Sequence, residues 1–306
     1  MASLLQRVKS KTAIFAHRKA RGMLDGEYAS VFRGRSLDFD DLRAYLPGDE
    51  VRDIDWKASA RHGSPLIRRY VAVRRQTVLL VTDTGRNMAA EARSGEVKKD
   101  IAVLALGVLG YLAHRHGDLV GLVCGDASST HPLPAKGGEA HLERLLRHVD
   151  SHTTLDGAAS RIQDQLEYVA RNVTGRHLLF VVADELAGDP ATAKLLRRLR
   201  AQHEVLWLTI RDAHLAPSGG AGEGWSPDRD PVTGPDSYSV ADSSLLAPPA
   251  ALSAAVAHAY EKATAHRDAG RRAMLRAAGI TDGEVESSRD VITALFALLE
   301  RHRRAG

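Results

Sequence analysis

Three loops that follow apolar or helical segments carry side chains able to hold a hard divalent cation. Asp83 comes directly after the apolar run 77–82, Asp184 follows the run 177–183, and Thr153 lies between two predicted helices. If the two runs are strands of one parallel sheet, their carboxyl ends share an edge, which is where ligands bind in open α/β sheets. Carboxylates and hydroxyls are the oxygen ligands that Mg²⁺ prefers. The pattern therefore predicts a cation site at the strand ends.

The same acidic residues have two other interpretations. Asp83 and Asp184 are also typical of side chains that cap a following helix or accept hydrogen bonds from backbone amides. In a metal-dependent hydrolase, both carboxylates would instead hold a metal-bound water. The sequence has no evident general base, no Gly-x-Ser-x-Gly elbow, no Gly-x-x-x-x-Gly-Lys loop and no His-Glu-x-x-His helix. We therefore expect a protein that is not an enzyme.

A second candidate site is the segment 32–61, in which arginines, carboxylates, glycines and aromatic residues follow no helical or strand period. Arginine and tryptophan are common anchors of protein interfaces, so the segment is a candidate for binding an acidic partner. Alternatively, its arginines pair with the neighbouring aspartates, because bidentate ion pairs can hold a turn-rich segment in one conformation. Both interpretations stay open from the sequence. The candidate partner-binding residues are Arg33, Arg35, Arg43, Arg52, Trp56 and Arg61.

The elements that must position these residues alternate between apolar strands and helices. The runs VLLV, LLFVV and VLWLTI are typical of parallel strands covered on both faces. The alternation predicts a doubly wound α/β fold with a mostly parallel sheet. Strands are predicted at 77–82, 119–124, 177–183 and 205–210, and helices at 96–116, 139–149, 158–172, 191–202, 250–278 and around 291–299.

Composition divides the chain into five segments. They are a basic amphipathic helix (1–25), the Arg- and Asp-rich segment (26–76), the α/β core (77–212), a Gly- and Pro-rich loop (213–249) and C-terminal helices (250–306). The basic helix either docks on the core with its cationic face in solvent or associates with an anionic membrane surface or nucleic acid.

The overall composition limits the classes of partner and compartment. Of 306 residues, 42 are Lys or Arg and 38 are Asp or Glu, and a formal net charge of only +4 does not favour nucleic acid as a partner. Cys124 is the only cysteine, which excludes an intrachain disulfide and fits a reducing compartment; its apolar surroundings predict a buried side chain. The longest apolar run, 101–113, is shorter than the roughly 20 residues that span a bilayer. We therefore expect a cytoplasmic protein without a transmembrane segment.

The segment 32–61 also resembles the signature of a known bacterial family. The residues that carry the resemblance are Arg33, Arg35, Asp38, Phe39, Arg43, Pro47-Gly48-Asp49, Arg52, Asp53, Asp55, Trp56 and Ser59-Ala60-Arg61. They resemble the family catalogued as domain of unknown function number fifty-eight, which joins this signature to a von Willebrand factor A-like domain. The resemblance implies a von Willebrand A-like, Rossmann-like core and covers the C-terminal segment as well.

The resemblance further implies a metal-ion-dependent adhesion site, whose first loop reads Asp-x-Ser-x-Ser in von Willebrand A domains. By position, Asp83, Thr153 and Asp184 match that site, whereas Gly85 and Asn87 stand where the two serines would be. Gly85 offers no hydroxyl, and Asn87 offers an amide oxygen instead. The implied site is therefore degenerate, with Asp83, Asn87, Thr153 and Asp184 as its residues and Mg²⁺ as its ion.

Finally, the resemblance implies a function. Members of the family commonly accompany MoxR-type ATPases of the AAA+ class, and the association implies a role in assembling, activating or loading metal into other proteins. Many members begin with membrane helices, whereas this chain begins with a basic helix and is similar to soluble members. We accordingly expect a non-catalytic adaptor that binds a MoxR-type ATPase and a client protein, with the strand-end face as its recognition surface.

Overall fold

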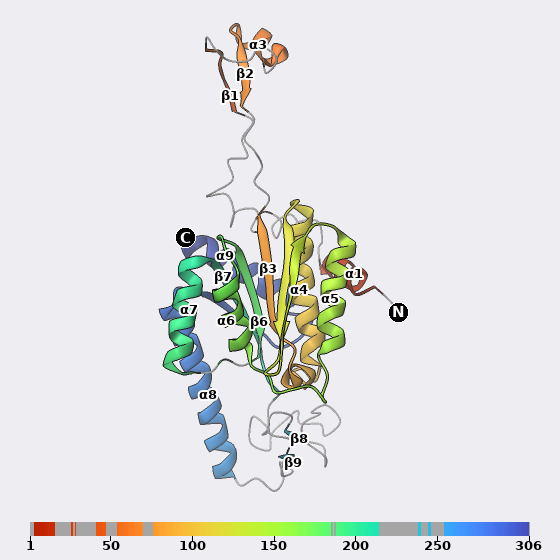
Figure 1. Ribbon diagram of the computed structural model, residues 1–306, viewed down its shortest axis with the longest axis vertical. Helices are drawn as coiled ribbons and strands as arrows, with labels where there is room; N and C mark the ends of the chain where they lie inside the picture. Colours follow the sequence, from red (N-terminus) through yellow and green to blue (C-terminus); the bar gives the residue numbers. More distant parts are fainter. Residues whose placement is uncertain are drawn as a thin grey trace.

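The computed structural model describes residues 3–15, 26, 28, 41–46, 54–69, 76–184, 186, 188–213, 238–239, 244–245 and 254–305. Its centre is a six-stranded sheet with the strand order β10-β7-β6-β3-β4-β5 (Figure 1). Neighbouring strands are parallel except for β5, which pairs antiparallel with β4. The strands are β3 (Thr77–Asp83), β4 (Leu119–Gly125), β5 (Thr130–Lys136), β6 (Leu178–Ala183), β7 (Glu204–Ile210) and β10 (Thr281–Val285). The predicted doubly wound, mostly parallel α/β fold is confirmed.

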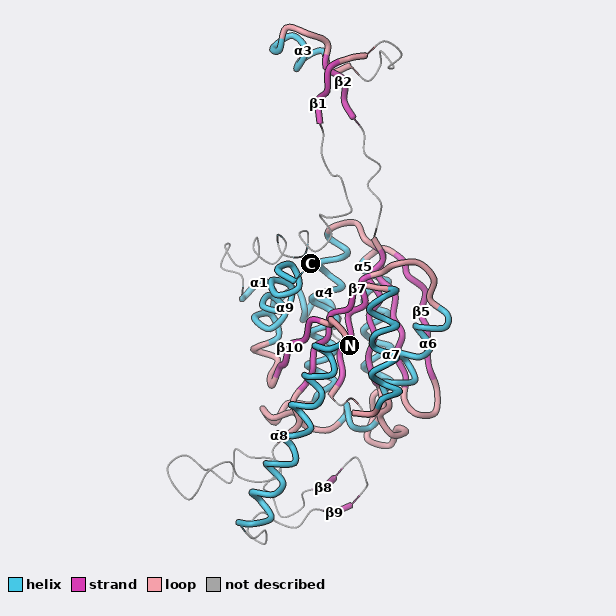
Figure 2. Tube along the Cα trace, turned by 90° about the vertical axis from the view of Figure 1, so that its left-hand side faces the viewer, coloured by secondary structure: helices cyan, strands magenta, loops and turns pink. Residues whose placement is uncertain are grey.

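Helices cover both faces of the sheet because successive side chains of a strand point to opposite sides. Val78 and Leu80 of β3 belong to one core, which also contains residues of α1, α4, α5 and α9. Leu79 and Val81 belong to a second core on the other face, with residues of α6, α7 and α8. Figure 2 shows α9 and α7 on opposite sides of the strands. The helices are α1 (Leu4–Phe15), α4 (Lys98–Arg115), α5 (Glu139–His152), α6 (Ile162–Asn172), α7 (Pro190–Gln202), α8 (Ala254–Ala277) and α9 (Val291–Ala305).

Two strands of the sheet are absent from the sequence prediction. β5 contains Pro132 and Pro134, which cannot donate to a strand ladder, and the sheet accommodates them in its outermost strand. β10 lies in the C-terminal segment that is predicted to be helical, and it pairs parallel with β7, with Thr281 opposite Leu206. The α/β core therefore extends beyond Asp212 and includes a C-terminal strand.

The segment 213–249, predicted to be a loop, lies mostly outside the described residues. Within it, β8 (Tyr238–Ser239) and β9 (Ser244–Leu245) form a short antiparallel pair. Across the described ranges, no helix combines the length and the apolar character needed to span a bilayer.

The first helix, α1, is docked on the core. Leu4, Leu5 and Val8 are buried, and α1 contacts both α4 and α5. Gly107 makes room for this contact, because a β-carbon there would lie 2.5 Å from a methyl group of Val8. The Glu143 carboxylate accepts hydrogen bonds from the amides of Leu4 (3.1 Å) and Leu5 (2.7 Å) and so satisfies the start of the helix. Of the two interpretations of this helix, the structure shows the docked one.

Replacing Glu143 with alanine is expected to loosen α1, because the first amides of the helix lose their acceptor. Loss of a helix cap costs about 1 kcal/mol. Hydrogen–deuterium exchange should become faster at residues 4–12 and stay unchanged in β3. Glu167→Ala is the matched control, since it removes only the exposed ion pair with Arg171. Equal exchange of α1 in both variants would contradict the capping role.

The described part of the Arg- and Asp-rich segment forms a small unit of its own. β1 (Asp41–Ala44) pairs antiparallel with β2 (Leu66–Arg69), and α3 (Trp56–His62) lies between them in the chain. Asp55 caps α3 by accepting from the amides of Lys57 (3.1 Å) and Ala58 (3.0 Å). The buried Ser59 hydroxyl donates to the Asp55 carbonyl (2.7 Å) and accepts from the Leu66 amide (2.8 Å), which joins the helix to β2. We call residues 41–46 and 54–69 the signature unit.

Figure 1 shows the signature unit on the side of the sheet where β3 begins. β2 ends at Arg69 and β3 begins at Thr77, so the chain enters the sheet at the amino end of its first core strand. The acidic loops lie at the carboxyl end of that strand, about 20 Å away at roughly 3.3 Å per residue. The signature unit and the strand ends are therefore two separate candidate sites.

Candidate functional site

The carboxyl ends of three neighbouring strands each carry an aspartate. Asp83 is the last residue of β3, Asp184 directly follows β6, and Asp212 lies two residues beyond β7. These strands are adjacent in the order β7-β6-β3, so the fold places the three carboxylates along one edge of the sheet. Asp83 and Asp184 are buried, with exposed fractions of 1% and 5%. The sequence prediction brings Asp83 and Asp184 to this edge but does not include Asp212.

A buried lysine lies among these carboxylates. The Lys98 ammonium donates a hydrogen bond to Asp184 Oδ2 (2.8 Å) and a second one to Asp212 Oδ1. The Lys98 and Asp184 side chains are only 3% and 2% exposed, whereas Asp212 is 49% exposed. Burial opposes the charged form of Lys98, but the Asp184 and Asp212 carboxylates outweigh it and raise the lysine pKa above its ordinary value. The lysine therefore stays charged and neutralises one of the two carboxylates.

The backbone around Lys98 fixes its position at the strand ends. Lys98 is the first residue of α4, and its amide donates to the Ala90 carbonyl (2.9 Å). In the loop before it, Ala92 forms an antiparallel bridge with Asp212, and the Arg93 amide donates to the Arg211 carbonyl (3.0 Å). The loop from β3 to α4 is thus tied to the end of β7, which places the start of α4 beside Asp212.

The carboxylate of Asp83 is held mainly by backbone amides. Its two oxygens accept hydrogen bonds from the amide of Gly85 (2.6 Å) and the amide of Arg161 (2.5 Å). Burial, followed by the negative charge of Asp184, raises the pKa of Asp83 to about 7, even though these amides and the Ser160 hydroxyl act in the opposite direction. Asp83 therefore joins the loop after β3 to the start of α6. This contact is the structural role that the sequence left as an alternative to metal binding.

Asp83→Asn is expected to remove part of the pH dependence of stability. The folded chain holds the Asp83 proton up to a pH of about 7, whereas an unfolded aspartate releases it near pH 3.8. Because the folded state binds the extra proton in this window, the free energy of unfolding of the wild type decreases as pH rises through it, by at most about 1.4 kcal/mol per pH unit. Urea unfolding of both chains at several pH values measures the difference. Parallel pH profiles would contradict the raised pKa.

Gly85 is required because the loop before α6 passes directly over it. A β-carbon at position 85 would lie 2.5 Å from Ser160 Cα, 2.6 Å from its amide nitrogen and 2.7 Å from its hydroxyl oxygen. A serine at position 85, as in the adhesion-site motif, does not fit without a shift of this backbone. The space that its side chain would take is filled by Ser160.

The remaining predicted ligands make other contacts. Thr153 is buried at the end of α5, and its hydroxyl donates to the Val149 carbonyl (2.8 Å), within its own helix. Asn87 is half-buried in a short 3-10 helix (Arg86–Ala89), where its backbone carbonyl accepts from the Ala90 amide (3.1 Å). No contact in the described part of the chain joins either side chain to Asp83 or Asp184.

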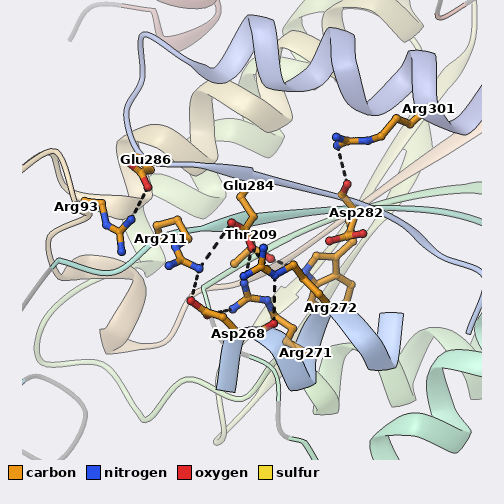
Figure 3. A network of polar contacts seen from close by, with 11 residues as sticks. Arg93, Thr209, Arg211, Asp268, Arg271, Arg272, Asp282, Glu284, Glu286 and Arg301 are labelled. Carbon is orange, nitrogen blue, oxygen red and sulfur yellow. Dashed lines mark hydrogen bonds and ion pairs between the residues drawn. The ribbon is translucent and has the colours of Figure 1, made fainter. Parts of the chain in front are cut away.

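The three aspartates face a cleft of about 910 Å³ whose other wall is α8. Figure 3 shows the ion pairs that build this wall. Arg271 on α8 donates to Asp268 (2.9 Å) and to Glu284 of β10 (2.7 Å), and Arg211, just after β7, also pairs with Asp268. The network fastens α8 to the ends of β7 and β10. Arginines and carboxylates alternate along it, so the cleft does not carry a charge of one sign.

The candidate partner-binding residues lie only partly within the described residues. Arg33, Arg35 and Arg52 lie outside them, and of Arg43 only the backbone, in β1, is described. Trp56 opens α3 with 66% of its surface exposed, and Arg61 is exposed one turn later. The Asp55 carboxylate is engaged as the cap of α3. For the residues described, the aspartate is structural and the tryptophan faces solvent.

The fold and the site together define a class of protein. It is a doubly wound α/β domain with a separate signature unit, and two of its strand-end carboxylates, Asp184 and Asp212, are paired with the buried Lys98. The chain belongs to the family described as Protein of unknown function DUF58, whose model matches residues 41–220. The membership predicted from the signature residues is confirmed.

The prediction that the Cys124 side chain is buried is confirmed as well. Burial, followed by the negative charge of Asp83, raises the pKa of its thiol to about 12.

Curated relatives come from mycobacteria. "Uncharacterized protein Mb1516" of Mycobacterium bovis and "Uncharacterized protein Rv1480" of Mycobacterium tuberculosis are each 27% identical over 197 residues. The match covers 63% of this chain and 61% of each relative, so it spans less than two thirds of the relatives' own length.

Solved structures with a similar arrangement have low identity. An aerotolerance-related membrane protein from Bacteroides fragilis aligns with a TM-score of 0.40 and 13% identity, covering 74% of this chain and 99% of that one. A von Willebrand factor type A protein from Catenulispora acidiphila aligns with a TM-score of 0.38 and 9% identity, covering 76% and 43%. The fold class of this chain rests on its own strand order and register.

Proposed function

We propose that this chain is a non-catalytic adaptor that binds a partner protein through the signature unit. The observation that carries the proposal is the exposure of Trp56, a large aromatic side chain 66% accessible on a helix that Asp55 caps. Among the described residues, the other strongly exposed large hydrophobic side chains are Leu46, also in the signature unit, and Leu155. Exposed tryptophan is typical of an interface anchor.

The charge around Trp56 indicates the chemistry of the partner. Lys57 and Arg61 are exposed on α3 and are four residues apart, so they share one side of the helix next to Trp56 and Ala60. Asp55, the acidic residue beside them, is turned toward the start of the helix as its cap. This face therefore suits an acidic surface that offers a pocket for an aromatic ring.

The strand-end carboxylates are less suited to direct contact with a partner or substrate. Asp83 and Asp184 are buried, and their oxygens are engaged by backbone amides and by Lys98. A hydrolase would need these oxygens to hold a metal-bound water. Binding at the signature unit therefore accounts for more of the observed geometry than catalysis at the strand ends.

We further propose that the partner is a MoxR-type ATPase of the AAA+ class, acting with this chain on a client protein. Support comes from membership of the family and from the resemblance of the signature residues, with Trp56 and Arg61 exposed on α3.

The test is to mix the purified chain with the MoxR-type ATPase of the same organism and to measure the mass of the complex by size exclusion with light scattering. Samples contain ADP or a non-hydrolysable ATP analogue with Mg²⁺, which the ATPase itself requires. We expect co-elution in at least one nucleotide state. Separate elution in every state would overturn the proposed partner.

A further inference from the structure

The resemblance to von Willebrand A domains implies a Mg²⁺ ion at the strand ends, and the residues present do not fit one. The Thr153 hydroxyl is turned back to its own helix, and position 85 has no room for a serine side chain. Asp184, which would have to ligate the ion, already accepts from the Lys98 ammonium at 2.8 Å. Over the described residues, no group of three or more His, Cys, Asp or Glu side chains is arranged to hold a metal ion.

We infer that the Lys98 ammonium takes the place of that ion, so that the strand-end site of this chain is independent of divalent metal. The ammonium lies between carboxylates from the ends of two adjacent strands, β6 and β7, as a bridging cation would. Its side chain is 3% exposed, so it belongs to the interior and not to a surface ion pair. A divalent cation bound to Asp184 would lie within a few ångströms of this buried positive charge, where repulsion is strong.

A lysine at the strand ends differs from a bound metal ion in its permanence. A bound ion exchanges with solvent and can be removed by a chelator, whereas Lys98 is covalently part of α4. The lysine therefore links the start of α4 permanently to the ends of β6 and β7. Any recognition that takes place in the cleft beside Asp212 is then insensitive to the concentration of Mg²⁺.

The experiment compares the wild type with Lys98→Ala, using Mn²⁺ as a paramagnetic probe and Mg²⁺ in thermal unfolding. The wild type should bind no Mn²⁺ that is lost in Asp184→Asn, and Mg²⁺ should not move its unfolding midpoint. Lys98→Ala should unfold on the order of 10 °C lower. Without the ammonium, Asp184 and Asp212 lose the cation between them, so added Mg²⁺ should raise the variant's midpoint progressively with concentration. Asp126→Asn, in an exposed loop, controls for adventitious Mn²⁺ binding.

Two results would overturn the inference. One is Mn²⁺ bound to the wild type that disappears in Asp184→Asn but persists in Asp126→Asn, since the site would then hold a metal beside the lysine. The other is a folded Lys98→Ala variant whose midpoint does not respond to Mg²⁺, since the lysine would then not stand in for an ion. If Lys98→Ala does not fold, the wild-type titration decides alone.

Discussion

Replacing Lys98 with methionine is expected to lower the free energy of unfolding by about 3–5 kcal/mol, the cost of leaving a buried charge without its partner. Methionine fills nearly the same volume, so the loss comes from the charge and not from a cavity. Asp184, with 2% of its side chain exposed, would have to remain ionised without the ammonium or take up a proton. Denaturant unfolding at neutral pH measures the loss.

A double-mutant cycle separates this charge effect from other consequences of the substitution. Adding Asp184→Asn to Lys98→Met removes the uncompensated charge, so the double variant should recover part of the loss. Lys99→Met is the matched control, because Lys99 is 28% exposed. It loses an ion pair with Asp150 at 3.7 Å and hydrogen bonds to the Asp150 and Thr153 carbonyls (3.2 and 3.3 Å), and it should cost clearly less than Lys98→Met. Equal losses in Lys98→Met and Lys99→Met would show that the strand ends do not depend on the buried ammonium.

Replacing Trp56 with alanine is expected to weaken partner binding by at least about 30-fold, which corresponds to the 2 kcal/mol or more of an interface hot spot. Because 66% of the side chain is exposed, the unfolding midpoint should hardly change. Titration of the ATPase into each variant by calorimetry measures the affinity. Leu155→Ala is the control, since Leu155 is 59% exposed but lies on the α/β core. If Leu155→Ala weakened binding more than Trp56→Ala, the interface would lie on the core.

The regular part of the fold could be predicted because its strands are apolar on both faces. The fully buried run of β6, for example, has few alternatives to a covered parallel strand. β5 and β10 could not be predicted in this way. β5 carries two prolines, and β10 reads Thr-Asp-Gly-Glu-Val, so neither has the apolar pattern of a core strand. Their pairing depends on the edges that β4 and β7 offer, which is tertiary information.

The strand-end site could be predicted only in part, for a similar reason. Asp83 and Asp184 follow apolar strands and are recognisable from that position. Asp212 follows the run VLWLTI in the same way, so the signal for it is present in the sequence. Lys98 carries no such signal, because a lysine in Val97-Lys98-Lys99-Asp100 is typical of a solvated helix start. The bridge between Ala92 and Asp212, together with the hydrogen bond from the Arg93 amide to the Arg211 carbonyl, brings it to the carboxylates.

The most direct test of the proposed interface is photo-crosslinking from position 56. A photoreactive phenylalanine analogue is incorporated in place of Trp56 or, in a second chain, in place of Leu155, and each chain is irradiated with the ATPase and the nucleotide that supports co-elution. We expect crosslinks to the ATPase from position 56, mapping to an acidic surface, and few from position 155. Crosslinks from position 155 with none from position 56 would contradict it.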